Sequence, residues 1–138
     1  QRSTFVVISA MTMGSGLTLR GLRGATTCST NTVVAIEQAV SELMDALVKH
    51  NALKPDCIVS ITFSVTTDLD ACFPAAAARR REGWDGVALL DCQQMAVEGD
   101  LARCIRLLAH TWMPADQELR HVYLGEASRL RPDRSSHN

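Results

Sequence analysis

One segment, Thr32–His50, restricts the possible folds of this chain more than any other, because its sequence is that of a long helix with a single apolar face. Its apolar residues recur at helical spacing: Val33, Ile36, Ala39, Val40, Leu43, Met44 and Leu47. Thr32 or Asn31 can cap its start, and Asn51 followed by Pro55 marks its end. Such a helix needs a partner for its apolar face, so the remaining chain must supply a surface to pack against it.

Strand patterns on both sides of the helix supply that surface. In Cys57–Thr66, Val59, Ile61, Phe63 and Val65 alternate with polar residues, which predicts a strand with one apolar face. We predict further strands at Leu17–Arg23, Val87–Asp91 (short and buried) and Leu119–Ala127, a break in regular structure within 20–27, and a short helix over Pro74–Arg81. Leu101–Trp112 is ambiguous, because its residue types favour a helix while its apolar positions follow no single face. One long helix among strands indicates an α+β domain.

The composition excludes several classes of protein. The 138 residues are 46% hydrophobic, which suits one domain with one core. Only 21% are charged and the net charge is −1, which argues against a nucleic-acid-binding protein, because such a protein needs a basic face. Five cysteines without a C-x-x-C pair, and scattered histidines, predict free thiols and no metal site. No apolar run approaches the roughly 18 residues of a membrane span.

The ends of the chain are expected to lie outside the fold. Residues 1–16 contain no acid and are rich in Ser, Thr and Met, so we expect a disordered N-terminal extension. This extension is either a remnant of a targeting peptide or an artefact of the start, with Met11 or Met13 as the natural initiator. The domain then covers 17–134, and 135–138 form a tail. The expected location is the cytoplasm, or the plastid stroma if the extension is a transit remnant.

The chemistry of this chain is expected to depend on arginine. There is no G-x-S-x-G, H-E-x-x-H or G-x-x-x-x-G-K-[ST] motif, so we predict neither a covalent catalyst nor a bound cofactor. Arg23 lies near glycines, Arg106 is flanked by apolar residues, and Arg131 precedes a proline near the end. Each can be a salt bridge or a side chain that reaches solvent along apolar neighbours, and for Arg106 an anion site is an equal alternative, while the Arg79–Arg81 run favours a solvated face. Guanidinium groups bind carboxylates in a fork geometry, so a cluster of them indicates an acidic small-molecule ligand.

Six motifs resemble those of one enzyme family, in its order and near its spacing. They are Arg20–Thr27, Thr67–Ala75, Gly83-Trp84, Cys104-Ile-Arg106, Arg120–Leu124 and Leu130-Arg-Pro132. Together they resemble the monofunctional chorismate mutases of the trimeric type, over about residues 18–134. The resemblance implies a homotrimer of pseudo-α/β-barrel form, in which each subunit has a mixed sheet of about five strands and one long helix. It also implies that Leu101–Trp112 is largely a strand and that the active sites lie between subunits.

The resemblance implies an isomerase that converts chorismate to prephenate, in phenylalanine and tyrosine biosynthesis, without a cofactor or metal. By position, Arg106 matches the catalytic arginine at the ether oxygen of the substrate, and Gln94 a second catalytic position. The other residues that match substrate-binding positions are Arg23 and Tyr123 on substrate carboxylates, Phe73, Ala75 and Arg79 on the wall from the adjacent subunit, Leu90, Asp91, Cys92, Gln93 and Gln94 in the lining loop, and Leu130 and Arg131 in the C-terminal segment.

Three positions depart from the pattern of that family. Gln94 stands where many members carry a glutamate, and Ala76 replaces a lysine often found at the edge of the cleft. Asp91 stands where others carry a cysteine, and a carboxylate there repels a dianionic substrate unless it is turned away or paired with an arginine. These departures keep one alternative open, a non-catalytic trimeric protein that binds a carboxylated small metabolite.

Overall fold

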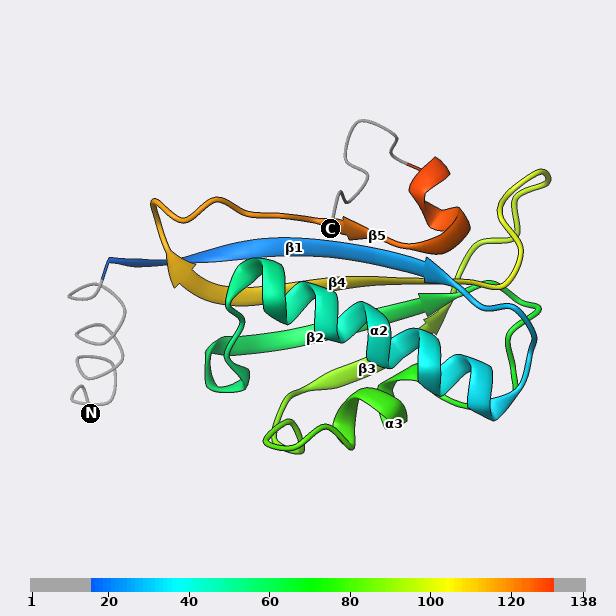
Figure 1. Cartoon of the computed structure of the whole chain (residues 1–138), viewed down its shortest axis with the longest axis horizontal. Helices are drawn as coiled ribbons and strands as arrows, with labels where there is room; N and C mark the ends of the chain where they lie inside the picture. Colours follow the sequence, from blue (N-terminus) through cyan, green and yellow to red (C-terminus); the bar gives the residue numbers. More distant parts are fainter. Residues whose placement is uncertain (1–15, 131–138) are drawn as a thin grey trace.

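The computed structural model describes residues 16–130. The expectations for an N-terminal extension before Gly16, for the tail at 135–138 and for Arg131 concern residues outside this range. Within it, one sheet carries the long helix on one face (Figure 1). No helix in the described part of the chain is long and apolar enough to cross a membrane.

The sheet is mixed and has five strands, as the resemblance implied. In chain order the elements are β1 (Leu17–Thr27), α2 (Val33–Asn51), η1 (Pro55–Cys57), β2 (Ile58–Val65), α3 (Pro74–Arg79), β3 (Leu89–Gln93), β4 (Cys104–Pro114), β5 (Val122–Tyr123) and η2 (Gly125–Arg129). The strand order is β3-β2-β4-β1-β5. β4 is antiparallel to both β1 and β2, whereas β3 is parallel to β2 and β5 is parallel to β1. The ambiguous segment is therefore mostly the central strand β4, which confirms the expectation of a strand there.

Helix α2 forms where its apolar stripe predicted it. Thr32 is the N-cap, and its hydroxyl accepts a hydrogen bond from the Ala35 N–H at 3.1 Å. Ala52 ends the helix in the left-handed region at φ 52°, where its N–H donates to the Val48 carbonyl. The predicted stripe is buried from Ile36 to Leu47 against apolar residues of β1, β2 and β4, and this contact forms the core, whereas Val33 at its start is 45% exposed.

The predicted strands differ from the observed ones in extent or facing. β1 continues through Thr27, so Gly21 and Gly24 interrupt no pairing with β4. Val59 is 48% exposed and Ile58 is buried, because an irregularity between Ile58 and Ser60 shifts the register and reverses the predicted facing of Val59. The strand expected at Leu119–Ala127 is limited to Val122–Tyr123, because Gly125 turns the chain at φ 58° into η2.

The short strand predicted at Val87–Asp91 is present but shifted and less buried. It runs over Leu89–Gln93 as the edge strand β3, and Leu90 is 59% exposed. An edge strand has a neighbour on one side only, so its side chains have fewer contacts than those of β4. The short helix α3 begins at Pro74, as predicted, and ends at Arg79.

Asn51 ties the end of α2 to the segment that leads into β5. Its side chain is 1% exposed; the amide nitrogen donates to the carbonyls of Leu47 and Arg120, and the amide oxygen accepts from the Arg120 N–H at 2.8 Å. Gln117 adds a bond from its side chain to the Asn51 carbonyl at 2.7 Å. This buried amide therefore fixes where the chain enters β5.

All five cysteines are free thiols, as the sequence predicted. Burial raises the pKa of the Cys28 thiol to about 11. Burial also raises the pKa of Cys104, on β4. Both side chains therefore stay protonated at neutral pH and act as small apolar residues of the interior.

Gly24 lies at the tightest contact between β1 and α2. A Cβ atom there would sit 3.1 Å from Leu47 Cδ1 and 3.2 Å from Leu43 Cδ1, and both leucines are fully buried. Gly24→Ala should therefore lower the free energy of unfolding by about 1–3 kcal/mol through overpacking. The measurement is urea unfolding followed by circular dichroism, at one fixed protein concentration.

Gly86→Ala is the matched control, because a Cβ atom at Gly86 would meet nothing within 4 Å. It should unfold at the midpoint of the parent. Equal midpoints for the Gly24→Ala and Gly86→Ala variants would show that the leucines move aside at little cost and that the contact is not tight.

Candidate active site

Arg23 and Arg106 lie on neighbouring strands and on the same face of the sheet. The register pairs Arg23 of β1 with Leu108 of β4, and Ala25 with Arg106, so the two arginines occupy diagonal positions of one antiparallel ladder. Leu22 and Leu107, at alternate positions, are buried in the core. Because side chains alternate along a strand, the arginines lie on the face opposite α2.

Tyr123 and Leu130 complete a cavity around these arginines. It has a volume of about 240 Å³ and is lined by Arg23, Gly24, Ala25, Arg106, Leu107, Tyr123 and Leu130. The Tyr123 ring is 7% exposed and packs in a small apolar cluster with Ala25 and Ala127. This volume is somewhat below the roughly 300–1,000 Å³ of a typical small-molecule site.

Hydrogen bonds between β1 and the β5 region hold this cavity together. The Leu124 N–H donates to the Ala25 carbonyl at 2.9 Å. The Arg23 N–H donates to Nδ1 of His121 at 3.0 Å, so that ring nitrogen is unprotonated in this arrangement. Together with the bonds of Asn51, they fix Tyr123 relative to Arg23.

Arg106 has an acidic partner that the sequence analysis did not identify. Its Nη2 atom lies 3.1 Å from Oδ1 and 3.2 Å from Oδ2 of Asp100, in the loop before β4. Nε2 of Gln94 donates to Oδ2 of the same carboxylate. Asp100 therefore links the two residues that the resemblance marks as catalytic. The missed signal is simple, because a half-buried arginine flanked by apolar residues needs a partner and Asp100 is an acid only six positions earlier.

Two polar atoms of this cluster have no partner. Nε of Arg106 and Oε1 of Gln94 are buried and make no hydrogen bond within the described residues. Buried polar groups are almost always paired, so each atom is a candidate for contact with a ligand. One is a donor and the other an acceptor.

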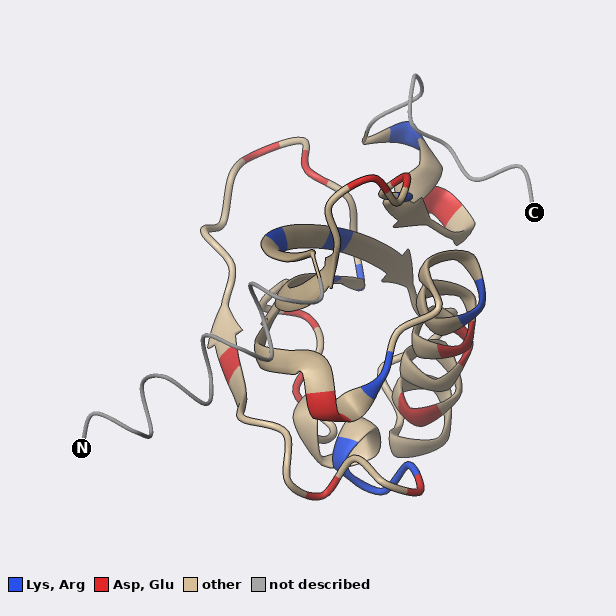
Figure 2. Ribbon diagram, turned by 90° about the vertical axis from the view of Figure 1, so that its left-hand side faces the viewer, with Lys and Arg blue, Asp and Glu red and all other residues tan. Residues whose placement is uncertain are grey.

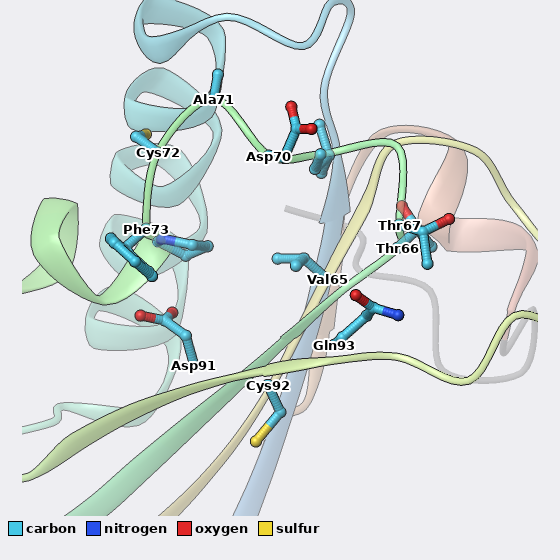
Figure 3. A pocket seen from close by; sticks show the side chains of 12 residues that line it. Val65, Thr66, Thr67, Asp70, Ala71, Cys72, Phe73, Asp91, Cys92 and Gln93 are labelled. Atoms are coloured by element: carbon cyan, nitrogen blue, oxygen red, sulfur yellow. The ribbon is translucent and has the colours of Figure 1, made fainter.

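A second cavity contains other residues that the resemblance marks. It has a volume of about 370 Å³, is lined partly by Phe73, Asp91, Cys92 and Gln93, and shares no residue with the arginine-lined cavity. Figure 3 shows Phe73 and Asp91 at one end of it and Thr66, Thr67 and Gln93 at the other. Phe73 is 70% exposed, which is unusual for a phenylalanine.

Asp91 is turned toward its own chain. Its Oδ1 accepts a hydrogen bond from the Ala75 N–H at 3.0 Å. Burial raises the pKa of Asp91, while this bond and the positive charge of Arg79 oppose the increase. Asp91 would repel an anionic ligand less if it were turned away or had an arginine nearby, and both conditions are met in part.

The arginines at the end of α3 have different environments. Arg80 pairs with Glu37 and Arg81 pairs with Asp45 at 2.8 Å, both on α2. Figure 2 shows both signs of charge along that helix. Arg79 has no ion pair within the described residues, and Ala75, on the same helix, is buried. The structure thus separates Arg79, a predicted site residue, from its two surface-paired neighbours.

The sequence-predicted residues therefore form two groups. Arg23, Arg106, Tyr123 and Leu130 line one cavity, with Gln94 linked to it through Asp100. Phe73, Asp91, Cys92 and Gln93 line the other, with Ala75, Arg79 and Leu90 on its flanking elements α3 and β3. Within the described range, no group of three or more His, Cys, Asp or Glu side chains is arranged to hold a metal ion. What the first cavity offers is positive charge and hydrogen-bond donors, as expected for a carboxylated ligand.

The chain is similar in sequence and in fold to known proteins. The family described as chorismate mutase type I matches residues 19–134. A protein named chorismate mutase AroH from Bacillus subtilis (strain 168) is 42% identical over 119 residues, covering 85% of this chain and 93% of that protein. Another of the same name from Thermus thermophilus is 44% identical over 121 residues, covering 86% and 98%. The solved structure of a chorismate mutase from Clostridium thermocellum (Cth-682) superposes with a TM-score of 0.74 at 41% identity, over 80% of this chain and 98% of that one.

Proposed function

This chain belongs to the type I chorismate mutase family, and from that premise we propose how its arginine-lined cavity isomerises chorismate to prephenate. The observation that carries the proposal is the convergence of Arg23, Arg106 and Tyr123 on one cavity, with Nε of Arg106 buried and unpartnered. A site of this kind suits a small dicarboxylate whose negative charge becomes redistributed during reaction.

The reaction is an intramolecular Claisen rearrangement. One C–O bond of chorismate breaks while one C–C bond forms, so atoms and electrons balance within a single molecule. No nucleophile or proton donor is required. The protein must hold the flexible dianion in the compact conformation in which the reacting ends meet, and must stabilise negative charge that grows on the ether oxygen.

Arg106 is the residue we assign to the ether oxygen. Its guanidinium is anchored by Asp100 and lies close to the buried Cys104 thiol, while its Nε–H makes no hydrogen bond within the described residues. A donor held in place before the reaction stabilises the transition state without reorganisation. Gln94, on the other side of Asp100, is the second residue that we place at the reacting part of the substrate.

Arg23 and Tyr123 are assigned to the substrate carboxylates. A guanidinium and a phenol are both suitable donors to carboxylate oxygens, and both side chains line the same cavity as Arg106. Leu130 lines the same cavity, and the resemblance to the family assigns the next residue in the sequence, Arg131, to substrate binding as well. Three donors around one small volume would restrict the conformations of a flexible dianion.

The remaining half of the site is supplied, in our proposal, by a neighbouring subunit of a homotrimer. The wall residues Phe73 and Arg79 lie at the β3 side of the sheet, whereas the arginine-lined cavity lies at the β1–β5 side. Exposed apolar side chains, among them Leu19, Leu108 and Phe73, are available for such an interface. Three copies related by a rotation could each close the incomplete cavity of the next with this wall.

Arg106→Ala should lower kcat by about 100-fold to 1,000-fold, on the scale of one lost oxyanion donor. The assay is the disappearance of chorismate absorbance with micromolar protein, and a bicyclic dicarboxylate that mimics the transition state should inhibit the parent strongly. Arg80→Ala, in an exposed ion pair, is the control and should keep parental turnover. Near-parental turnover by the Arg106→Ala variant would remove Arg106 from the mechanism. If the parent protein does not turn over chorismate, the alternative of a non-catalytic binding protein would be favoured.

The rate should not depend on pH between about 6 and 8, because arginine, glutamine and tyrosine side chains do not change charge in that range. The measurement is kcat across that range at saturating chorismate. His121 is the residue to examine if a limb appears near neutrality, because protonation of its Nδ1 would break the bond from the Arg23 N–H. A bell-shaped profile would show that a titrating group is essential.

Complementation between inactive variants tests whether the site is shared by two copies. We expect Arg106→Ala and Arg79→Ala to be nearly inactive separately, because they damage opposite halves of the site. Unfolding and refolding them together in equal amounts should restore about one quarter of parental turnover, because random trimers combine an intact Arg106 with an intact Arg79 at one site in four.

The control mixture is Arg106→Ala with Arg23→Ala, whose changes lie in the same cavity. It should recover nothing, because no combination of subunits contains both arginines in one half-site. Equal recovery in both mixtures, or none in either, would contradict the shared site.

A further inference from the structure

We propose that Asp100 is a positioning residue, which orients Arg106 and Gln94 so that their unpartnered atoms face the substrate. The inference rests on the proposed function of the arginine-lined cavity. Its observations are independent of that function, because they are contacts of Asp100 within one chain. Asp100 has no assigned role in the match to the family.

The contact with Arg106 restrains the guanidinium at one end. Both carboxylate oxygens of Asp100 lie within 3.2 Å of Nη2, and the two side chains are 36% and 22% exposed. A guanidinium is planar, so fixing Nη2 also restricts the direction of the Nε–H. That N–H is buried and unpartnered. Asp100 therefore leaves the donor that we assign to the ether oxygen available and restrained.

The contact with Gln94 selects one orientation of an amide. A carboxylate only accepts hydrogen bonds, so Gln94 must turn its Nε2 toward Asp100, as it does here. Oε1 of Gln94 then faces the other way, buried and without a partner, where it can accept from a hydroxyl of the substrate. Without Asp100 the amide could rotate and offer a donor in its place.

Asp100 itself is held by its loop. Its Oδ1 accepts from the Leu101 N–H at 2.8 Å, and its own N–H donates to the Val97 carbonyl at 3.1 Å. Gly99 allows this tight turn with φ at 86°. The Gln94 N–H donates to the Val65 carbonyl of β2 at 2.8 Å, so the other end of the loop is fixed to the sheet.

Asp100→Ala should lower kcat by about 10-fold to 100-fold with a smaller change in KM, because orientation is lost while the positive charge that attracts the dianion remains. Asp100→Asn keeps an acceptor for the Leu101 N–H and should fold if the alanine variant does not. It should lose less activity. Glu98→Gln, an exposed acid of the same loop, is the charge-matched control and should keep parental values.

An exchange of the two groups separates positioning from a structural role. Gln94→Glu alone places two carboxylates in contact and should lower kcat. Combining Gln94→Glu with Asp100→Asn restores one carboxylate and one amide, and should return kcat to within about threefold of the parent. A residue that only caps the loop would leave kcat of the Asp100→Asn variant alone at the parental value, because the asparagine keeps the acceptor for the Leu101 N–H.

A readout without substrate makes the inference testable even if chorismate is not turned over. The Nε–Hε signal of Arg106 in a ¹⁵N-correlation spectrum, assigned by its absence in Arg106→Lys, should be sharp in the parent and broadened in Asp100→Ala. If parental turnover is absent but the signal behaves this way, the proposed function fails and the positioning role stands. Unchanged kcat and an unchanged signal in Asp100→Ala would overturn it, as would a rise in kcat, since Asp100 would then block Arg106.

Discussion

The antiparallel pairing of β1 with β4 is the constraint on which the rest of this structure depends. The register runs without a break from Leu17↔Pro114 to Thr27↔Cys104, in the middle of the sheet. Because side chains alternate along each strand, the same register that turns Leu22 and Leu107 toward α2 turns Arg23 and Arg106 toward the opposite face. A slip of one residue between β1 and β4 would turn the side chains of one strand to the wrong face, burying its arginine and exposing its leucines, so the stability of the fold and the geometry of the cavity are fixed by one set of hydrogen bonds.

Holding a guanidinium on a half-buried sheet face has a free-energy cost that another group must offset. A buried charge without a partner is strongly unfavourable, whereas a charge that is fully paired has nothing left to offer a ligand. The cluster of Asp100, Arg106 and Gln94 lies between these limits, since one end of the guanidinium is paired and Nε is not. On this view, the carboxylate lowers the free-energy cost of the half-buried charge before substrate binds. It leaves part of the guanidinium without a hydrogen bond for the reaction.

Patterns that extend over many residues could be predicted from the sequence, and local backbone irregularities could not. The stripe of α2 was predictable because many apolar residues recur at helical spacing, and Thr32 was predictable as its cap because it directly precedes that pattern. Val59 was misplaced because one irregularity in β2 reverses a facing without changing the alternation of residue types. β4 could not be distinguished from a helix by periodicity, and the resemblance identified it. The sequence offered an acid six positions before Arg106, but the contact of Asp100 with Arg106 depends on a turn at Gly99 that no periodicity encodes.

The division of the predicted site into two separate cavities has a physical consequence for the fold. A sheet that buries its core with one long helix on one face leaves the other face with few contacts, and among the described residues a small cluster packs there, in which Tyr123, Ala127, Leu101 and Leu130 surround Ala25. The exposed Leu19, Leu108 and Phe73 are then unfavourable for an isolated subunit. In the proposed trimer, the same association that covers these side chains brings the cavity lined by Phe73 and Asp91 to the arginine-lined cavity of the next copy. Assembly and substrate binding would therefore depend on one interface, and an isolated subunit would lack part of the site.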